Sequence, residues 1–184
     1  MNSLIESCVI PWWESMFLTQ DELKKKKIRP APTLYKAQLK RCQDIDSATW
    51  ADGFRALWFS LPENVTEKAE QKNITLWAMI AVTLVYVKTN TTTNLATAAG
   101  TKTENDKPIV SAHRFAQLQA ARTPDEFIMR LRRILQQLDG KVSVLSLAND
   151  IDRWMKEYHQ SRPPYRANKR LCVQWAMDYY KASK

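Results

Sequence analysis

Glycine is scarce in this chain, and its scarcity bears on the fold. The sequence has 184 residues with 3 glycines, while 45% of its residues are hydrophobic. An all-β protein needs many tight turns, and glycine adopts their backbone conformations most easily. A chain of this length buries about 70% of its unfolded surface and needs no disulfide or metal to fold. We therefore expect an all-α fold, in one domain or two small ones.

Cysteine and histidine are also scarce, which limits the chemistry that the chain can carry. Its 3 cysteines are odd in number and lack a CxxC spacing, which argues against a disulfide framework and against a zinc site. The histidines, His113 and His159, each stand alone without the HxxxH or ExxH spacing of metal ligands. No glycine-rich phosphate loop or nucleophile elbow is present. We expect a protein that is not an enzyme, with no catalytic residue, no metal and no cofactor.

A long apolar run is absent as well. The most apolar stretch, residues 76–87, contains Thr83 and is too short to span a bilayer. The N-terminus lacks the basic segment and apolar run of a secretory signal. These absences predict a soluble, cytoplasmic protein with no membrane partner.

Positive charge is abundant and unevenly distributed. The net charge is +9, and residues 93–184 hold 16 Lys and Arg against 9 Asp and Glu. Residues 1–92 are nearly balanced, with 12 against 10. A concentrated positive charge is typical of proteins that bind nucleic acid or another anionic surface. A solvated basic face without a ligand would give the same composition.

The clearest single element is a helix that starts near residue 124. Thr123 fits the N-cap, Pro124 the first helical position, and Glu126 a capping box to the Thr123 backbone. Gly140 fits the stop. The apolar side chains at helical spacing are Phe127, Leu131, Ile134, Leu135 and Leu138. The side chains assigned to the outer face are Arg130, Arg132 and Arg133.

Other segments follow the same helical period. Further helices are expected at 2–28 (interrupted by Pro11), 33–42, 47–61, 111–121, 143–160 and 165–182. Trp50 belongs to an apolar stripe in the helix expected at 47–61. Residues 73–88 are apolar nearly all round, and we interpret them as a central buried helix rather than a strand. Residues 89–108 show no period and are interpreted as an exposed, flexible loop. The predicted organisation is two small helical bundles, 1–92 and 93–184, joined by that loop.

Basic side chains recur on the predicted amphipathic helices, which favours contact with nucleic acid. Cations dispersed over rigid helices suit phosphate contacts, which position a strand without reading its sequence. No helix-turn-helix or RNA-binding strand motif is present. The tryptophans lie mostly on apolar stripes, so core packing is favoured over base stacking. The predicted nucleic-acid-binding residues are Lys40, Arg41, Arg114, Arg122, Arg132, Arg133, Lys169 and Arg170.

Several motifs together resemble one protein family. The run SAHRFAQLQAARTPDEFIMRLRRILQQL, at 111–138, carries its arginine-bearing helix and its "LRRLL" helix. Residues 142–154, VSVLSLANDIDRW, are similar to its "LDWxxLAxDLxxW", and residues 169–180, KRLCVQWAMDYY, to its "VRRRWAxDYY". Upstream, residues 37–41 are similar to "AxLRR". On these motifs the chain resembles the small subunit of the type I-E CRISPR surveillance complex, Cascade.

The resemblance implies a non-catalytic subunit in antiviral defence. Such subunits are all-helical, pair as two head-to-tail copies, and contact the backbone subunits that carry the guide RNA and the large subunit. They bind the target and displaced DNA strands and stabilise the R-loop. Two alternatives remain open from the residues alone. One is a helical adaptor that binds only protein, and the other is a free-standing DNA-binding regulator.

Overall fold

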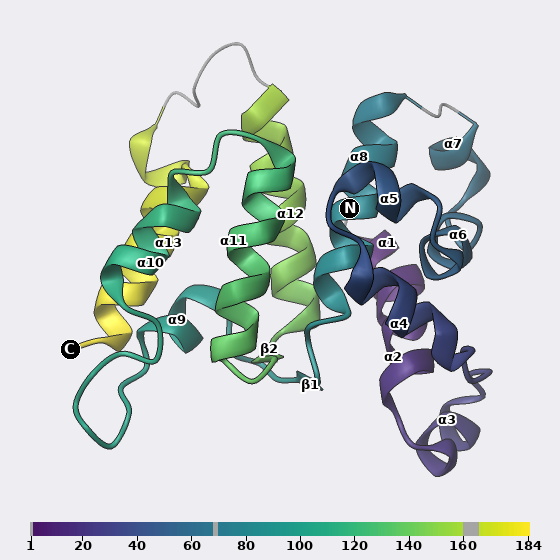
Figure 1. Ribbon diagram of the computed structural model, residues 1–184, viewed down its shortest axis with the longest axis horizontal. Helices are drawn as coiled ribbons and strands as arrows, with labels where there is room; N and C mark the ends of the chain where they lie inside the picture. The colour runs from purple at the N-terminus through teal and green to yellow at the C-terminus, as the bar shows by residue number, and fades with distance from the viewer. Residues whose placement is uncertain (1, 68–69, 160–165) are drawn as a thin grey trace. The chain divides into compact units, whose positions relative to one another are not determined.

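The chain divides into two compact units, Met1–Tyr86 (unit 1) and Val87–Lys184 (unit 2). The computed structural model describes residues 2–67, 70–159 and 166–184 (Figure 1). Over these ranges the regular structure is helical apart from two strands of two residues each. The predicted all-α class is therefore confirmed, while the division into bundles at 1–92 and 93–184 stays a prediction.

Unit 1 is built of short helices around one longer apolar helix. Its elements are α1 (Asn2–Leu4), the π-helix η1 (Ile5–Val9), α2 (Ile10–Phe17), α3 (Gln20–Lys26), α4 (Thr33–Arg41), α5 (Ile45–Thr49), α6 (Asp52–Trp58), α7 (Glu63–Thr66) and α8 (Gln71–Leu84). Every side chain from Leu76 to Leu84 in α8 is buried, and α4, α5 and α6 pack against it. A helix that is apolar on all faces is stable only when neighbours surround it. The prediction of a central buried helix is confirmed.

The helix break predicted at Pro11 is wrong. Pro11 lies in the first turn of α2, directly after η1. The π-helix η1 runs directly into α2, with Val9 in helical conformation, so the chain stays helical across Pro11. The break comes instead at Leu18 and Thr19. The Thr19 backbone N–H donates to the Glu22 carboxylate at 2.9 Å, which closes a capping box at the start of α3.

The single helix predicted at 47–61 is two helices, α5 and α6. Asp44 accepts a hydrogen bond from the Ser47 backbone N–H at 2.8 Å and caps α5. Trp50 lies in the turn between the two helices with 80% of its surface exposed, so its predicted core position is wrong. Apolar side chains on both sides of a turn reproduced the spacing of one continuous stripe.

Unit 2 combines four amphipathic helices with one short buried helix. Its elements are β1 (Thr89–Asn90), α9 (Leu95–Gly100), α10 (Ala112–Gln119), α11 (Pro124–Gln137), β2 (Lys141–Val142), α12 (Val144–His159), the 3-10 helix η2 (Ala167–Lys169) and α13 (Leu171–Ala182). Strands β1 and β2 pair in parallel, Thr89 with Lys141. Stacked rings join α10 to α13 through Phe115 and Tyr179, at 4.8 Å. They join α11 to α12 through Phe127 and Trp154, at 4.4 Å.

The prediction of an exposed loop at 89–108 is wrong over its middle. Residues 95–100 form α9, whose side chains are buried except at Thr97, and α9 packs against α13. The Asn94 side chain caps α9 by accepting from the Thr97 backbone N–H at 2.8 Å. The segment is rich in alanine and has few large apolar side chains, so it shows no hydrophobic stripe. Small side chains pack here because the two helix backbones lie close together.

Candidate nucleic-acid interface

The turn that leads into α11 places the first predicted contact, Arg122. The Thr123 hydroxyl accepts from the Glu126 backbone N–H at 3.2 Å, as predicted for the N-cap. The Glu126 carboxylate accepts from the Arg122 backbone N–H at 2.7 Å, so the predicted bond to the Thr123 backbone is wrong by one residue. At the other end of α11, Gly140 has φ 67° and its N–H donates to the Leu135 carbonyl at 2.8 Å, as predicted for the stop.

Some of the predicted cations gather at one end of unit 2. The α10–α11 turn, the end of α12 and the start of α13 lie at the same end (Figure 1). Arg122 belongs to that turn, and Lys169 and Arg170 immediately precede α13. The Arg153 guanidinium donates to the Lys169 carbonyl at 3.1 Å and to the Gln174 side chain at 2.7 Å, which fixes η2 against α12.

The remaining predicted cations lie elsewhere. Arg114 is in the first turn of α10 and Arg133 in the third turn of α11, away from the end that holds Arg122. Lys40 and Arg41 end α4 in unit 1. The Lys40 ammonium lies 5.8 Å from the centre of the Tyr86 ring.

Arg132 is not on the outer face of α11, where the sequence placed it. It is buried, with 9% of its surface exposed. It follows Ile128 by four residues and precedes Leu135 by three, and both of these side chains are fully buried. Residues at these spacings share one face of a helix, so Arg132 belongs to the core-facing side. Because the end of its side chain is charged, the apolar pattern alone did not predict that Arg132 faces the core.

The cations outside the core differ in whether an acid neutralises them. Arg130, also predicted on the outer face, pairs with the Glu126 carboxylate and donates to the Gln117 carbonyl, so it braces α11 to α10. Other predicted cations form no ion pair with any residue in the described ranges. These are Arg41, Arg114, Arg122, Arg133 and Lys169. Their charge is available to an external anion.

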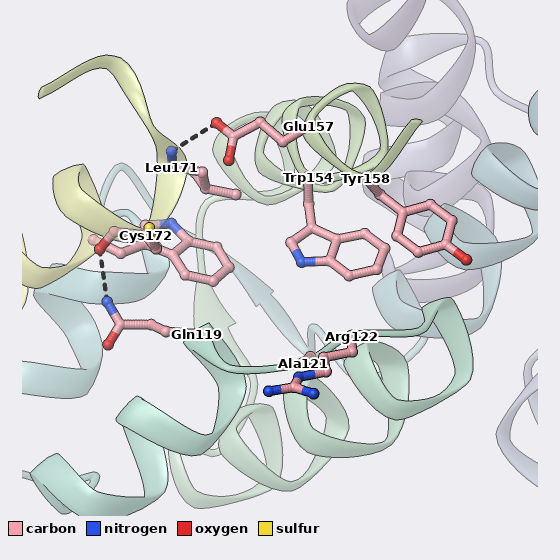
Figure 2. A pocket seen from close by; sticks show the side chains of 9 residues that line it. Gln119, Ala121, Arg122, Trp154, Glu157, Tyr158, Leu171 and Cys172 are labelled. Atoms are coloured by element: carbon pink, nitrogen blue, oxygen red, sulfur yellow. Dashed lines mark hydrogen bonds between the residues drawn. The ribbon is translucent and has the colours of Figure 1, made fainter. Parts of the chain in front are cut away.

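A pocket of about 320 Å³ lies at the end of unit 2 that holds Arg122 (Figure 2). Its lining is Gln119, Ala121, Arg122, Trp154, Glu157, Tyr158, Leu171, Cys172 and Trp175. The rings of Trp154 and Tyr158 stack with centres 5.2 Å apart, and 45% of Tyr158 is exposed. Two hydrogen bonds hold the pocket in shape. Gln119 donates to the Cys172 carbonyl at 2.7 Å, and Glu157 accepts from the Leu171 backbone N–H at 2.8 Å.

Sequence reasoning missed two of the three aromatic side chains of this pocket, Trp154 and Tyr158. Trp154 was grouped with the core tryptophans, and Tyr158 was not considered. They follow each other at i, i+4 on α12, the spacing that brings side chains together on a helix surface. An i, i+4 aromatic pair in the basic half of the chain was therefore the available signal. Arg122 lies near these two rings only because α10 and α11 fold against α12.

Asp150 is a partly buried carboxylate that accepts a hydrogen bond from Trp175, one of the residues that line the pocket. Burial raises the pKa of Asp150 from 3.8 to about 6, and the hydrogen bond from the Trp175 indole, at 2.9 Å, opposes that rise. The nearby charge of Arg153 also opposes it, whereas Asp178 adds to it. Because the folded state binds this proton more tightly than the unfolded chain does, Asp150 lowers stability increasingly as pH rises from 3.8 to about 6. Above that range the loss is complete.

Asp150→Asn is therefore expected to stabilise the protein at neutral pH. The amide oxygen still accepts from Trp175, and the buried negative charge is gone. The free energy of unfolding should rise by about 1–3 kcal/mol near pH 7.5, with the gain shrinking as pH falls toward about 4.5. Urea unfolding at the two pH values measures it. Glu104→Gln, an exposed carboxylate in the same unit, is the control and should change little. A gain that is equal at both pH values would contradict the assignment.

Two kinds of feature are absent from the described residues. Over 2–67, 70–159 and 166–184, no three His, Cys, Asp or Glu side chains gather where they would hold a metal ion. In the same ranges no helix has the length and apolar character needed to cross a membrane. The interface combines the guanidinium of Arg122, which forms no ion pair in the described ranges, with the stacked rings of Trp154 and Tyr158. Such groups suit an anion that also carries flat rings.

The comparison with protein families gives a match over most of the chain. The profile of the CRISPR-associated protein Cse2 matches residues 35–180. The matched region includes most of α4 and all of α10, α11 and α12. Neither a curated protein nor a solved structure gives a significant match.

Proposed function

Because the chain belongs to the CRISPR-associated Cse2 family, the small subunits of type I-E Cascade, we propose that it holds DNA strands in that complex by their phosphate backbone. The observation that carries the proposal is the set of exposed cations without an acidic partner among the described residues. Arg114, Arg122, Arg133 and Lys169 lie in four segments of unit 2, which are α10, the α10–α11 turn, α11 and η2. Spread-out cations fit an extended polyanion better than they fit one small anion.

Modest contacts between the protein and the strand backbone are sufficient for this role. R-loop formation exchanges one duplex for another of about equal stability, so contacts to the backbone can tip the balance. We propose that this subunit binds the target and displaced strands in that way, contributes no catalytic residue, and bridges the backbone subunits and the large subunit. A second copy of the chain, stacked head to tail, would double the number of these exposed cations.

Removing two cations tests the proposal. Arg114→Ala with Arg133→Ala should weaken target binding by the assembled complex for all target sequences alike. The salt dependence should become shallower, because each lost phosphate contact removes about 0.7 from the slope on single strands and about 0.9 on duplex. Titration of complex against labelled target at several salt concentrations measures both quantities. Arg132 is left in place, because it is buried and its loss would report on folding.

A matched control removes equal charge elsewhere in unit 2. Lys88 and Lys141 both lie within ion-pair distance of Asp139, so the Lys88→Ala, Lys141→Ala double variant loses two cations that are already neutralised in part. It should leave the slope nearly unchanged. Loss of binding for one target sequence only would favour a sequence-reading regulator. Unchanged affinity and slope in the arginine variant would favour an adaptor that binds only protein.

A further inference from the structure

We propose that the pocket between α10, α12 and α13 accepts one unstacked base of a bound DNA strand. The proposal rests on the proposed function, since it takes the strand as present and assigns a site to one of its bases. The pocket combines an aromatic wall, a cation without a partner in the described ranges, and a volume of about 320 Å³. That volume lies at the small end of the about 300–1,000 Å³ that small-molecule sites occupy. It is room for one ring system rather than for a helix or a strand.

The aromatic wall extends to the surface. Phe127, Trp154 and Tyr158 form a stacked series with ring centres 4.4 and 5.2 Å apart. Its inner member is fully buried, whereas Tyr158 is 45% exposed at the outer end. The series is thus anchored in the core and presents a ring at the pocket. Bases stack on such rings irrespective of sequence, because every base has a π-face.

The charges in the pocket indicate how a nucleotide would lie. Figure 2 shows Arg122 and Glu157 on opposite sides of the pocket, with the rings of Trp154 and Tyr158 along the wall between them. A phosphate is attracted to the guanidinium and repelled by the carboxylate, so the backbone runs past Arg122. The base then faces Glu157, one of whose oxygens is already held by the Leu171 N–H. The other oxygen can accept from an exocyclic amino group.

The surroundings favour a strand over a protein side chain as the occupant. Lys169, two residues before the lining residue Leu171, is exposed and pairs with no acid in the described ranges, and neither does Arg122. A partner side chain entering here would bring its backbone against this positive surface. A nucleotide brings a phosphate instead, whose charge complements it.

Base stacking is tested by comparing a base-bearing strand with an abasic one. The purified full-length chain is titrated with a short single-stranded DNA and with a deoxyribose-phosphate strand of equal length that lacks bases. The wild type should bind the base-bearing strand about 5- to 100-fold more tightly. Tyr158→Ala should reduce this ratio toward one and leave the salt slope unchanged. Tyr158→Phe keeps the ring and should restore the ratio.

The outcomes separate this proposal from the proposed function. If Arg133→Ala weakens binding of both strands while Tyr158→Ala leaves the ratio unchanged, strand binding stands and the base site is wrong. If the wild type binds neither strand, both proposals fall. If Tyr158→Ala instead prevents incorporation of the chain into the complex without changing strand binding, the pocket holds a protein side chain and the base site is wrong.

Discussion

Gly100→Ala is expected to destabilise unit 2 by about 3 kcal/mol or more. Gly100 ends α9 where that helix meets α13, and a methyl group built at this position would overlap the Tyr179 carbonyl oxygen. It would also lie 3.0 and 3.1 Å from the carbonyl carbon and Cα of the same residue. All three atoms belong to the backbone of α13. No side-chain rotation relieves the clash, so α9 and α13 must move apart.

The separation would reach beyond the two helices. The Tyr179 hydroxyl donates to the Val110 carbonyl at 2.6 Å, and the Val110 N–H donates to the Ala99 carbonyl at 3.0 Å. Both bonds bridge segments that the added methyl group would push apart. Tyr179 also stacks on Phe115 at 4.8 Å, so displacement of α13 disturbs the contact with α10. Strain at one carbon therefore spreads to several buried contacts.

Urea unfolding and hydrogen exchange measure the effect. Amides of 95–100 and 171–182 should exchange faster in the Gly100→Ala protein than in the wild type. Thr97→Ala is the control, since Thr97 is the partly exposed residue of the same helix and its change should cost less than about 0.5 kcal/mol. Equal stability of the two variants would mean that α9 does not lie against the backbone of α13.

The helices that the sequence predicted correctly are those with strong apolar periodicity or caps. For α11, the N-cap at Thr123, the first-turn Pro124 and the stop at Gly140 are local features, and each is found in the structure. For α8, the apolar run was long enough to require burial on all sides. In both cases a few neighbouring residues carry the whole signal, so no knowledge of distant contacts is needed.

The segments that were predicted wrongly depend on distant contacts or on small residues. α9 has no apolar stripe, and its helix is stabilised by close packing on α13, which is more than 70 residues away in the chain. Trp50 matched a stripe by chance, because the turn between α5 and α6 preserved the spacing. The pattern of neighbouring residues contains no information about packing against a distant helix, or about a turn that preserves the helical spacing.

The candidate interface, too, could be predicted only in part from the sequence. Basic clusters are visible in the sequence, but whether a given cation is exposed, paired or buried depends on the fold. Arg132 and Arg133 are neighbours in the chain, yet one faces the core and the other faces solvent. The pocket is a tertiary feature, because its lining comes from α10, α12, α13 and the α10–α11 turn. Only the i, i+4 pair of Trp154 and Tyr158 was visible beforehand.

Trp175→Ala is expected to have a comparably large effect, about 3–5 kcal/mol of lost stability. Trp175 is 4% exposed, and its ring lies 6.0 Å from Phe115 and 6.2 Å from Phe127. It therefore packs α13 against both α10 and α11. Its indole N–H is also the donor to Asp150, so truncation leaves a partly buried carboxylate without that partner. The lost ring contacts and the lost hydrogen bond to Asp150 therefore both add to the free-energy cost of the cavity that the missing ring creates.

Trp175→Phe separates the ring from the hydrogen bond. It keeps most of the packing and removes the donor that lowers the pKa of Asp150, so that pKa should rise further. A raised pKa of an acid costs stability only where the acid is ionised, so the loss should be greater near pH 7.5 than near pH 5. Urea unfolding of both variants at the two pH values measures it. A loss in Trp175→Phe that does not depend on pH would show that the bond to Asp150 contributes nothing to stability, leaving packing as the whole role of Trp175.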